Sequence, residues 1–235
     1  MRRLRTVALA AAAALAITAT WVPVTAAGKG DVAIVNGIPG AKVDICLDGR
    51  EIRSKLPYGK ATFKRVAAGG HRLKVVRRDP RTCRGKLLSE RKIWLPAGGD
   101  KTIVATKRRP KKFVVFSNDG LGRLGTPPIR SYMSWAWRHA ADVGVVSFRR
   151  DQSSPTPFAP AADPPWAKGQ EFAQYVEFFA GFAVIVTLVQ VPDSRTIVAG
   201  PIVTGVREGY RHEWLLVGTT LRNARIVTLK RPIDR

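Results

Sequence analysis

The chain has 235 residues, of which 45% are hydrophobic, and its formal net charge at pH 7 is +23. That apolar share is enough for a packed core and excludes a wholly disordered chain. A positive charge of this size attracts anionic partners and opposes self-association.

The first 27 residues have the pattern of a cleavable export signal. Three arginines precede an apolar run from Val7 to Ala19, and small residues follow, including Ala26 and Ala27. This order predicts a signal peptide at 1–27 that is cleaved at Ala26 or Ala27. The alternative is a membrane anchor, but a span needs about 20 apolar residues and this run is shorter.

Removal of the signal leaves 37 Lys and Arg against 17 Asp and Glu, a net charge of +20. We therefore expect a strongly basic secreted protein, either free outside the cell or retained at the cell surface by its charge. No transmembrane span is expected in the mature chain.

Cys46 and Cys83 are the two cysteines of the sequence. An even pair in an exported protein predicts a disulfide, and the alternative is two free thiols. The bond would close a loop of about 37 residues and contribute roughly 4 kcal/mol on the chain-entropy model. Two cysteines and three scattered histidines do not have zinc-site spacing, so we expect no metal and no cofactor.

Alternating polar and apolar residues predict β-strands through the first half of the mature chain. The alternation is clear at 41–45 and 71–75, and turn residues such as Asp48-Gly49 separate the runs. Asp-Gly between apolar runs is typical of a tight hairpin, because both central residues need positive φ. The short strands between Asp31 and Ser117 predict a sandwich.

The second half repeats the pattern of the first. A Gly- and Pro-rich stretch at 118–129 is typical of a linker. After it, residues 178–187 match residues 67–76, and further blocks recur at the same offset of about 110 residues, which favours a duplicated domain. The tight hairpin of the first half is replaced by a Pro-rich insert at 151–167, which we expect to be extended and on the surface.

An apolar run at 172–191 approaches the length of a membrane span. It contains Gln174, Glu177 and Gln190, and Gly181 lies where the first half has a turn. We interpret the run as two buried strands, with a membrane span as the alternative.

These observations predict an all-β protein with two tandem Ig-like or transthyretin-like antiparallel β-sandwich domains. The expected order is the signal at 1–27, a first domain at 28–117, the linker at 118–129 and a second domain at 130–235.

The order of strand and turn signals resembles the "domain of unknown function 4397" family. The likeness is carried by residues 31–49, Tyr58-Gly59, 67–70, 95–99 and 138–142. It extends over about 31–229, and it implies an exported bacterial β-sandwich protein, often with the domain in tandem. The family has no established activity.

Two residues depart from the family pattern. Asn36 stands where the family often has His, and Gly144 stands where its Asp would be expected, the place of Asp44 in the first half. A site that needs both residues would therefore be incomplete in either half.

No catalytic constellation is found in the sequence. There is no Gly-x-Ser-x-Gly elbow, and His139 and Asp142 lack a serine partner. The Gly-rich run at 120–125 lacks the strand-to-helix setting of a dinucleotide loop. We interpret His139 as a polar residue at a strand end, and His71 and His212 as surface residues. The sequence therefore predicts a non-enzymatic protein, with an unrecognised hydrolase as the alternative.

Positive charge is concentrated in the first half. Residues 31–117 hold 22 Lys and Arg against 7 acidic residues, and residues 118–235 hold 14 against 10. Because Leu73 and Val75 alternate with two of the cations, these cations should project from one solvent face. The candidate anion-binding residues form two clusters, which are Arg72, Lys74, Arg77, Arg78, Arg81 and Arg84, and then Lys107, Arg108, Arg109, Lys111 and Lys112.

We hypothesise that these clusters bind an anionic polymer of the cell envelope, since Arg pairs bidentately with phosphate and carboxylate. One alternative is a basic surface that only keeps the protein soluble. Another is a structural module that assembles or spaces surface proteins through the Pro-rich insert. Dedicated nucleic-acid binding is not expected, because Trp135 and Trp137 lie in the less basic half.

Overall fold

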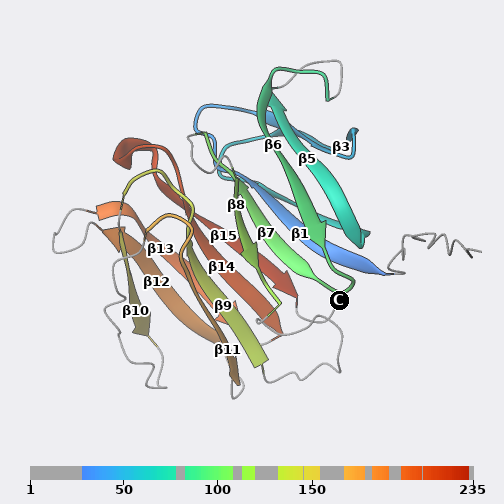
Figure 1. The fold of residues 1–235 in the computed structure, drawn as a ribbon. Helices are drawn as coiled ribbons and strands as arrows, with labels where there is room; N and C mark the ends of the chain where they lie inside the picture. Colours follow the sequence, from blue (N-terminus) through green and yellow to red (C-terminus); the bar gives the residue numbers. More distant parts are fainter. Residues whose placement is uncertain are drawn as a thin grey trace, which may run out of the picture.

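The structure is a computed structural model, and it describes residues 28–77, 83–107, 113–119, 132–144, 146–153, 167–177, 182–190, 197–207 and 209–232. Within these ranges the chain forms strands β1 to β15 and one short 3-10 helix, arranged in four sheets (Figure 1). The predicted all-β fold is confirmed. The predicted signal peptide, with its cleavage site at Ala26 or Ala27, lies outside the described residues.

Two sheets form the first sandwich. Its outer sheet has the order β3-β2-β5-β6, with bounds Arg50–Leu56, Val43–Leu47, Gly69–Arg77 and Leu87–Leu95. Its inner sheet has the order β4-β1-β7-β8, with bounds Ala61–Ala67, Lys29–Asn36, Asp100–Ala105 and Phe113–Ser117.

The second sandwich is built in the same way. Its inner sheet has the order β11-β9-β14-β15, with bounds Glu171–Glu177, Tyr132–His139, Tyr210–Val217 and Arg225–Pro232. Its outer sheet has the order β10-β12-β13, with bounds Ser147–Ser153, Phe182–Gln190 and Ile197–Arg207. The 3-10 helix at Leu221–Asn223 connects β14 to β15.

The strand directions differ from the prediction in one respect. The described strand pairs are antiparallel except for β1 with β7 and β9 with β14, which run parallel. These partners are far apart in the chain, so no short hairpin has to join them.

The apolar run at 172–191 falls largely in β11 and β12, as its interpretation as two strands predicted. In the described parts of the chain, no helix is long and apolar enough to cross a membrane. The first three residues of the predicted Pro-rich insert, 151–153, belong to β10, and residues 154–166 lie outside the described ranges.

Each sandwich has its own apolar core. In the first, alternate residues of the two sheets, such as Ile34 and Leu73, face each other and are fully buried. In the second, Trp137 stacks on Trp214 with ring centroids 4.8 Å apart. This places Trp137 in a core, away from any surface that could bind nucleic acid.

A third apolar cluster joins the two inner sheets. Val35 and Val104 of the first inner sheet meet Leu215 and Val227 of the second. The four sheets therefore form a stack in which both inner sheets are covered on both faces (Figure 1). Strands buried on both faces need apolar residues at successive positions, which explains the run Val32–Val35 in β1.

Equivalent hydrogen bonds recur where the first strand of each sandwich ends. Asn36 Oδ1 accepts the N–H two residues on (3.0 Å), and its Nδ2 donates to Ala41 O (2.8 Å). His139 Nδ1 accepts the N–H two residues on (3.2 Å), and its Nε2 donates to Gly144 O (2.6 Å). Asn36 thus replaces His139 with the same two bonds. Gly144 occupies the place of Ala41, so its predicted match to Asp44 is wrong.

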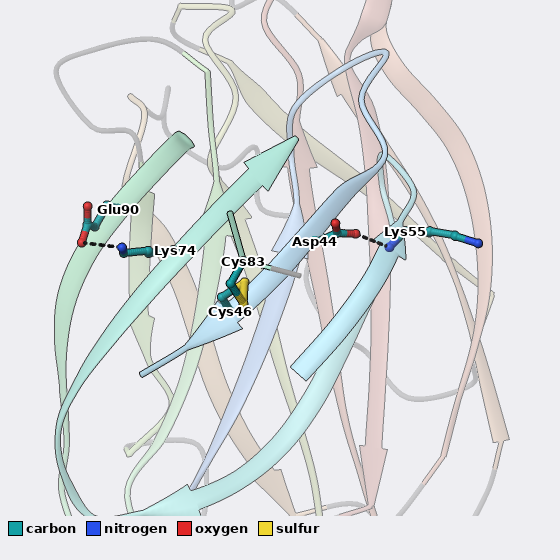
Figure 2. Close-up of a disulfide and its surroundings, with 6 residues drawn as sticks. All are labelled: Asp44, Cys46, Lys55, Lys74, Cys83 and Glu90. Carbon is teal, nitrogen blue, oxygen red and sulfur yellow. Dashed lines mark hydrogen bonds and ion pairs between the residues drawn. A yellow bond between two sulfur atoms is a disulfide. The ribbon is translucent and has the colours of Figure 1, made fainter. Parts of the chain in front are cut away.

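Two local predictions of the first sandwich are confirmed. Asp48 and Gly49 form the turn between β2 and β3, and both have positive φ (50° and 80°). Cys46 and Cys83 form a disulfide with a Cα–Cα distance of 5.8 Å. Cys46 lies between two core residues of β2, so the bond is on the outer face of the outer sheet (Figure 2).

The disulfide should stabilise the first sandwich by restricting the unfolded chain. For a loop of 37 residues the chain-entropy model gives roughly 4 kcal/mol, so Cys46→Ala/Cys83→Ala should unfold at a markedly lower urea concentration. Urea titrations followed by circular dichroism check this. A reductant should shift the midpoint of the parent protein and leave that of the double variant unchanged. Equal midpoints for the two proteins without reductant would contradict the expectation.

Candidate functional site

The structure describes five of the eleven predicted anion-binding residues, which are Arg72, Lys74, Arg77, Arg84 and Lys107. The other six lie outside the described ranges, and they are Arg78, Arg81, Arg108, Arg109, Lys111 and Lys112. On β5, Leu73 and Val75 alternate with Arg72 and Lys74 and are fully buried, as the alternation predicted.

Arg72 and Lys74 are less available to a ligand than the sequence implies. Arg72 Nε donates to Glu90 Oε1 on β6. Lys74 Nζ lies 3.9 Å from the same oxygen (Figure 2). The Arg72 side chain is 60% exposed, and that of Glu90 is 25% exposed. Two cations therefore share one carboxylate, so these three side chains together carry one net positive charge.

Three exposed cations gather at one end of the first sandwich. Arg77 ends β5, and its N–H donates to the carbonyl of Lys86 across the base of the loop (2.8 Å). Arg84 directly follows Cys83, which the disulfide joins to Cys46 of β2. Lys107 follows β7 at the same end, where Ser89 Oγ donates to Thr106 O (3.4 Å).

This group, Arg77, Arg84 and Lys107, is here called the basic end. All three residues are exposed, and none forms an ion pair with a carboxylate of the described residues. An exposed cation without a partner can bind an external anion without first breaking an internal pair.

The sequence did not reveal a network of buried charges between the inner sheets. Asp100 on β7 is only 4% exposed. Arg231 Nη1 donates to its Oδ1 (2.9 Å), Arg211 Nη1 donates to its Oδ2, and Asn118 Nδ2 also donates to Oδ1 (2.8 Å). Asn118, the first residue of the predicted linker, is therefore a buried part of the interface.

Glu213 on β14 is the second carboxylate of this network, and it is fully buried. Arg231 Nη2 donates to one of its oxygens (2.8 Å), and Thr102 Oγ1 and Arg138 Nη1 donate to the other (2.7 Å from Thr102). Burial favours the neutral acid, but Arg138, Arg231, the Thr102 hydroxyl and Arg211 outweigh it and lower the pKa of Glu213 to about 2. Glu213 is therefore a structural anion.

The network joins corresponding positions of the two sandwiches. Gly37 N–H donates to Ala105 O, and Ala140 N–H donates to Leu216 O, so these carbonyls are equivalent. Three residues before these carbonyls, Thr102 on β7 corresponds to Glu213 on β14, and two residues further back Asp100 corresponds to Arg211. Thr102 is hydrogen-bonded to Glu213, and Asp100 is hydrogen-bonded to Arg211. Contact between equivalent residues is the mark of a two-fold interface.

His71 is placed to carry a positive charge. Its Nδ1 lies 2.7 Å from Asp48 Oδ2 and its Nε2 lies 2.7 Å from Ala67 O, so only the doubly protonated ring satisfies both acceptors. Partial burial opposes the charge, but the bonds to Asp48 and Ala67 outweigh it and raise the pKa of His71. His71 thus helps to fix the β2–β3 turn.

His139 has the opposite arrangement. Its Nδ1 accepts a backbone N–H and its Nε2 donates, so the neutral ring satisfies both bonds. Burial lowers the pKa of His139, the nearby Lys168 adds to this, and the Gly144 carbonyl and Asp142 only partly oppose it. The interpretation of His139 as a polar residue at a strand end is confirmed. The expectation for His212 is wrong, because its ring is fully buried 6.1 Å from that of Trp214.

Across the ranges that the structure describes, no group of three His, Cys, Asp or Glu residues could hold a metal ion. Comparison with protein-family models and with curated proteins finds no match to the chain. The resemblance to the domain of unknown function 4397 family therefore stays a prediction.

Glu213→Gln should destabilise the protein by about 3 kcal/mol or more at pH 7, because arginines are left buried with too few carboxylates. The lowered pKa means that the ionised Glu213 stabilises the fold above about pH 4.5 and that this contribution is lost as the pH falls toward 2. Urea titrations between pH 2 and 7 measure both effects. The pH dependence of the variant should be shallower than that of the parent.

Glu51→Gln on β3 makes the same chemical change at a partly exposed position outside the network, and it serves as the control. If Glu213→Gln were no more destabilising than Glu51→Gln, the buried carboxylate would not hold the sheets together.

The two histidines should titrate in opposite directions from the ordinary value of 6.5. Ring-proton shifts measured by NMR should give a higher pKa for His71 and a lower one for His139. Asp48→Asn should lower the pKa of His71 and leave that of His139 unchanged. Because the His71 pKa is raised on folding, its charge stabilises the fold at low pH, and this contribution is lost as the pH rises through the folded-state pKa. An unchanged His71 pKa in the variant would contradict the pairing.

Proposed function

We propose that the protein is a secreted or envelope-associated, non-enzymatic protein that binds an anionic polymer of the cell envelope through the basic end. The observation that carries this proposal is that Arg77, Arg84 and Lys107 are exposed and unpaired among the described carboxylates. The disulfide supports an oxidising compartment outside the cytoplasm.

The disulfide also anchors part of the basic end. Arg84 directly follows Cys83, which is bonded to Cys46 of β2, and the Arg77 N–H donates to Lys86 O. A fixed array of cations loses less entropy on binding than a mobile one, so it favours a repeated anionic chain over scattered small ions.

Two of the three histidines, His71 and His139, favour a binding role over the hydrolase alternative. A general base needs a ring nitrogen that is free to accept a proton from substrate or water. The ring nitrogens of His71 and His139 are all engaged in hydrogen bonds within the protein.

The proposal is tested by a salt titration with the full mature chain. Arg77→Gln/Arg84→Gln/Lys107→Gln should weaken binding to a purified glycerol-phosphate polymer by at least about tenfold at low salt. The slope of log affinity against log salt concentration should become shallower by about 2, because binding with fewer phosphate contacts releases fewer counterions.

The control is Arg50→Gln/Arg53→Gln/Arg222→Gln, which removes the same charge from three exposed residues elsewhere. It should retain most of the affinity. Equal losses in the two triple variants would show that net charge alone attracts the polymer, and the basic end would then have no specific role.

A further inference from the structure

A groove runs along one side of the interface between the two sandwiches. One wall is β4, the end strand of the first inner sheet, and the other is β15, the end strand of the second. Two adjoining hollows of about 270 and 390 Å³ lie between these strands, and Phe63 and Lys230 line both. The Phe63 side chain is turned toward the second sandwich and is 45% exposed.

Two cations of the groove, Arg225 and Lys230, lie against aromatic rings. The Arg225 guanidinium lies 4.2 Å from the centre of the Tyr58 ring, and Lys230 Nζ lies 4.3 Å from that of Tyr210. A cation–π contact orients a cation without neutralising it. Within the described ranges, no carboxylate pairs with Arg225, Lys230 or the neighbouring Lys60.

The position of Arg225 depends on both sandwiches. Tyr58 belongs to the first, and its hydroxyl lies within hydrogen-bond distance of two carbonyls of the second, Asn223 O and Val217 O (3.2 Å to Val217). The arginine side chain lies across Gly59, where an added Cβ would be only 2.7 Å from its Cδ. Gly59 has a φ of +71°, which favours glycine there, and a larger residue would also displace the Arg225 side chain. The groove is therefore assembled in advance of binding.

The walls fit an extended chain that is not a β-strand. Arg225 and Lys230 are five residues apart on β15, which separates their Cα atoms by about 17 Å. The odd spacing places the two side chains on opposite faces of this end strand, and both line the larger hollow at its edge. Charged side chains and Pro232 on an end strand oppose pairing with another strand, so a peptide added to the sheet is disfavoured. The apolar ring of Phe63 suits the hydrophobic face of a sugar, and the cations suit carboxylates.

We propose that this groove binds an acidic polysaccharide, with Arg225 and Lys230 pairing with carboxylates and Phe63 packing against a sugar ring. The inference shares with the proposed function the expectation of an anionic polymer, but it depends on a different set of residues. It adds a second site and specifies the ligand as a chain of sugar acids.

The test compares two probes, an oligomer of uronic acid and inorganic polyphosphate of equal charge, by calorimetry with the full mature chain. Arg225→Gln/Lys230→Gln should weaken binding of the uronic-acid oligomer by at least about tenfold. Phe63→Leu keeps an apolar side chain but loses the flat ring. It should weaken binding of the uronic-acid oligomer several-fold and leave binding of polyphosphate unchanged. Arg50→Gln/Arg53→Gln is the matched charge control and should bind as the parent does.

Unchanged binding of the uronic-acid oligomer by Arg225→Gln/Lys230→Gln would overturn the inference, as would equal loss of both probes in Phe63→Leu. Thermal unfolding of each variant confirms that the fold is retained. The basic-end triple variant should keep its affinity for the uronic-acid oligomer. The proposed function is tested separately, because it fails if the basic-end triple variant loses no more affinity for the glycerol-phosphate polymer than its charge control does.

Discussion

The buried ion pairs between the inner sheets are the constraint on which the rest of the structure depends. Asp100 and Glu213 are shielded from water, and each is stabilised by ion pairs with two arginines and by one neutral donor, Asn118 for Asp100 and Thr102 for Glu213. Desolvation makes such pairs a weak source of net stability but makes any arrangement that separates them costly. We infer that the network selects one relative placement of the two sandwiches, while the apolar cluster around Val104 and Leu215 supplies the burial energy.

The candidate binding surfaces follow from this placement. With β7 set against β14, the end strands β4 and β15 come to lie on the same side of the interface, and Tyr58 reaches the carbonyl of Val217. The groove is thus a consequence of how the sandwiches meet, whereas the basic end belongs to the first sandwich and its disulfide. The two surfaces can be altered independently, and this separates the two proposals.

Local pattern was sufficient to predict the strands of the first sandwich, the Asp48-Gly49 turn and the disulfide, because each depends on neighbours in the chain or on cysteine chemistry. It did not predict the interface. A charged residue at an alternate strand position, such as Glu213, has the pattern of a solvent face, and only the second sheet converts that face into an interior. His212 alternates with Glu213 on β14, so it faces the core of its own sandwich beside Trp214 and is buried there rather than in the interface. The pairing of Arg72 with Glu90 depends on the register of β5 and β6.

We expect the buried charges to hold the two sandwiches together as one rigid body. This can be measured by residual dipolar couplings of backbone N–H groups in one alignment medium. Couplings from β1–β8 and from β9–β15 should fit a single alignment tensor. Two tensors that differ in magnitude or orientation would contradict it, because the sandwiches would then move independently and the groove would have no fixed shape.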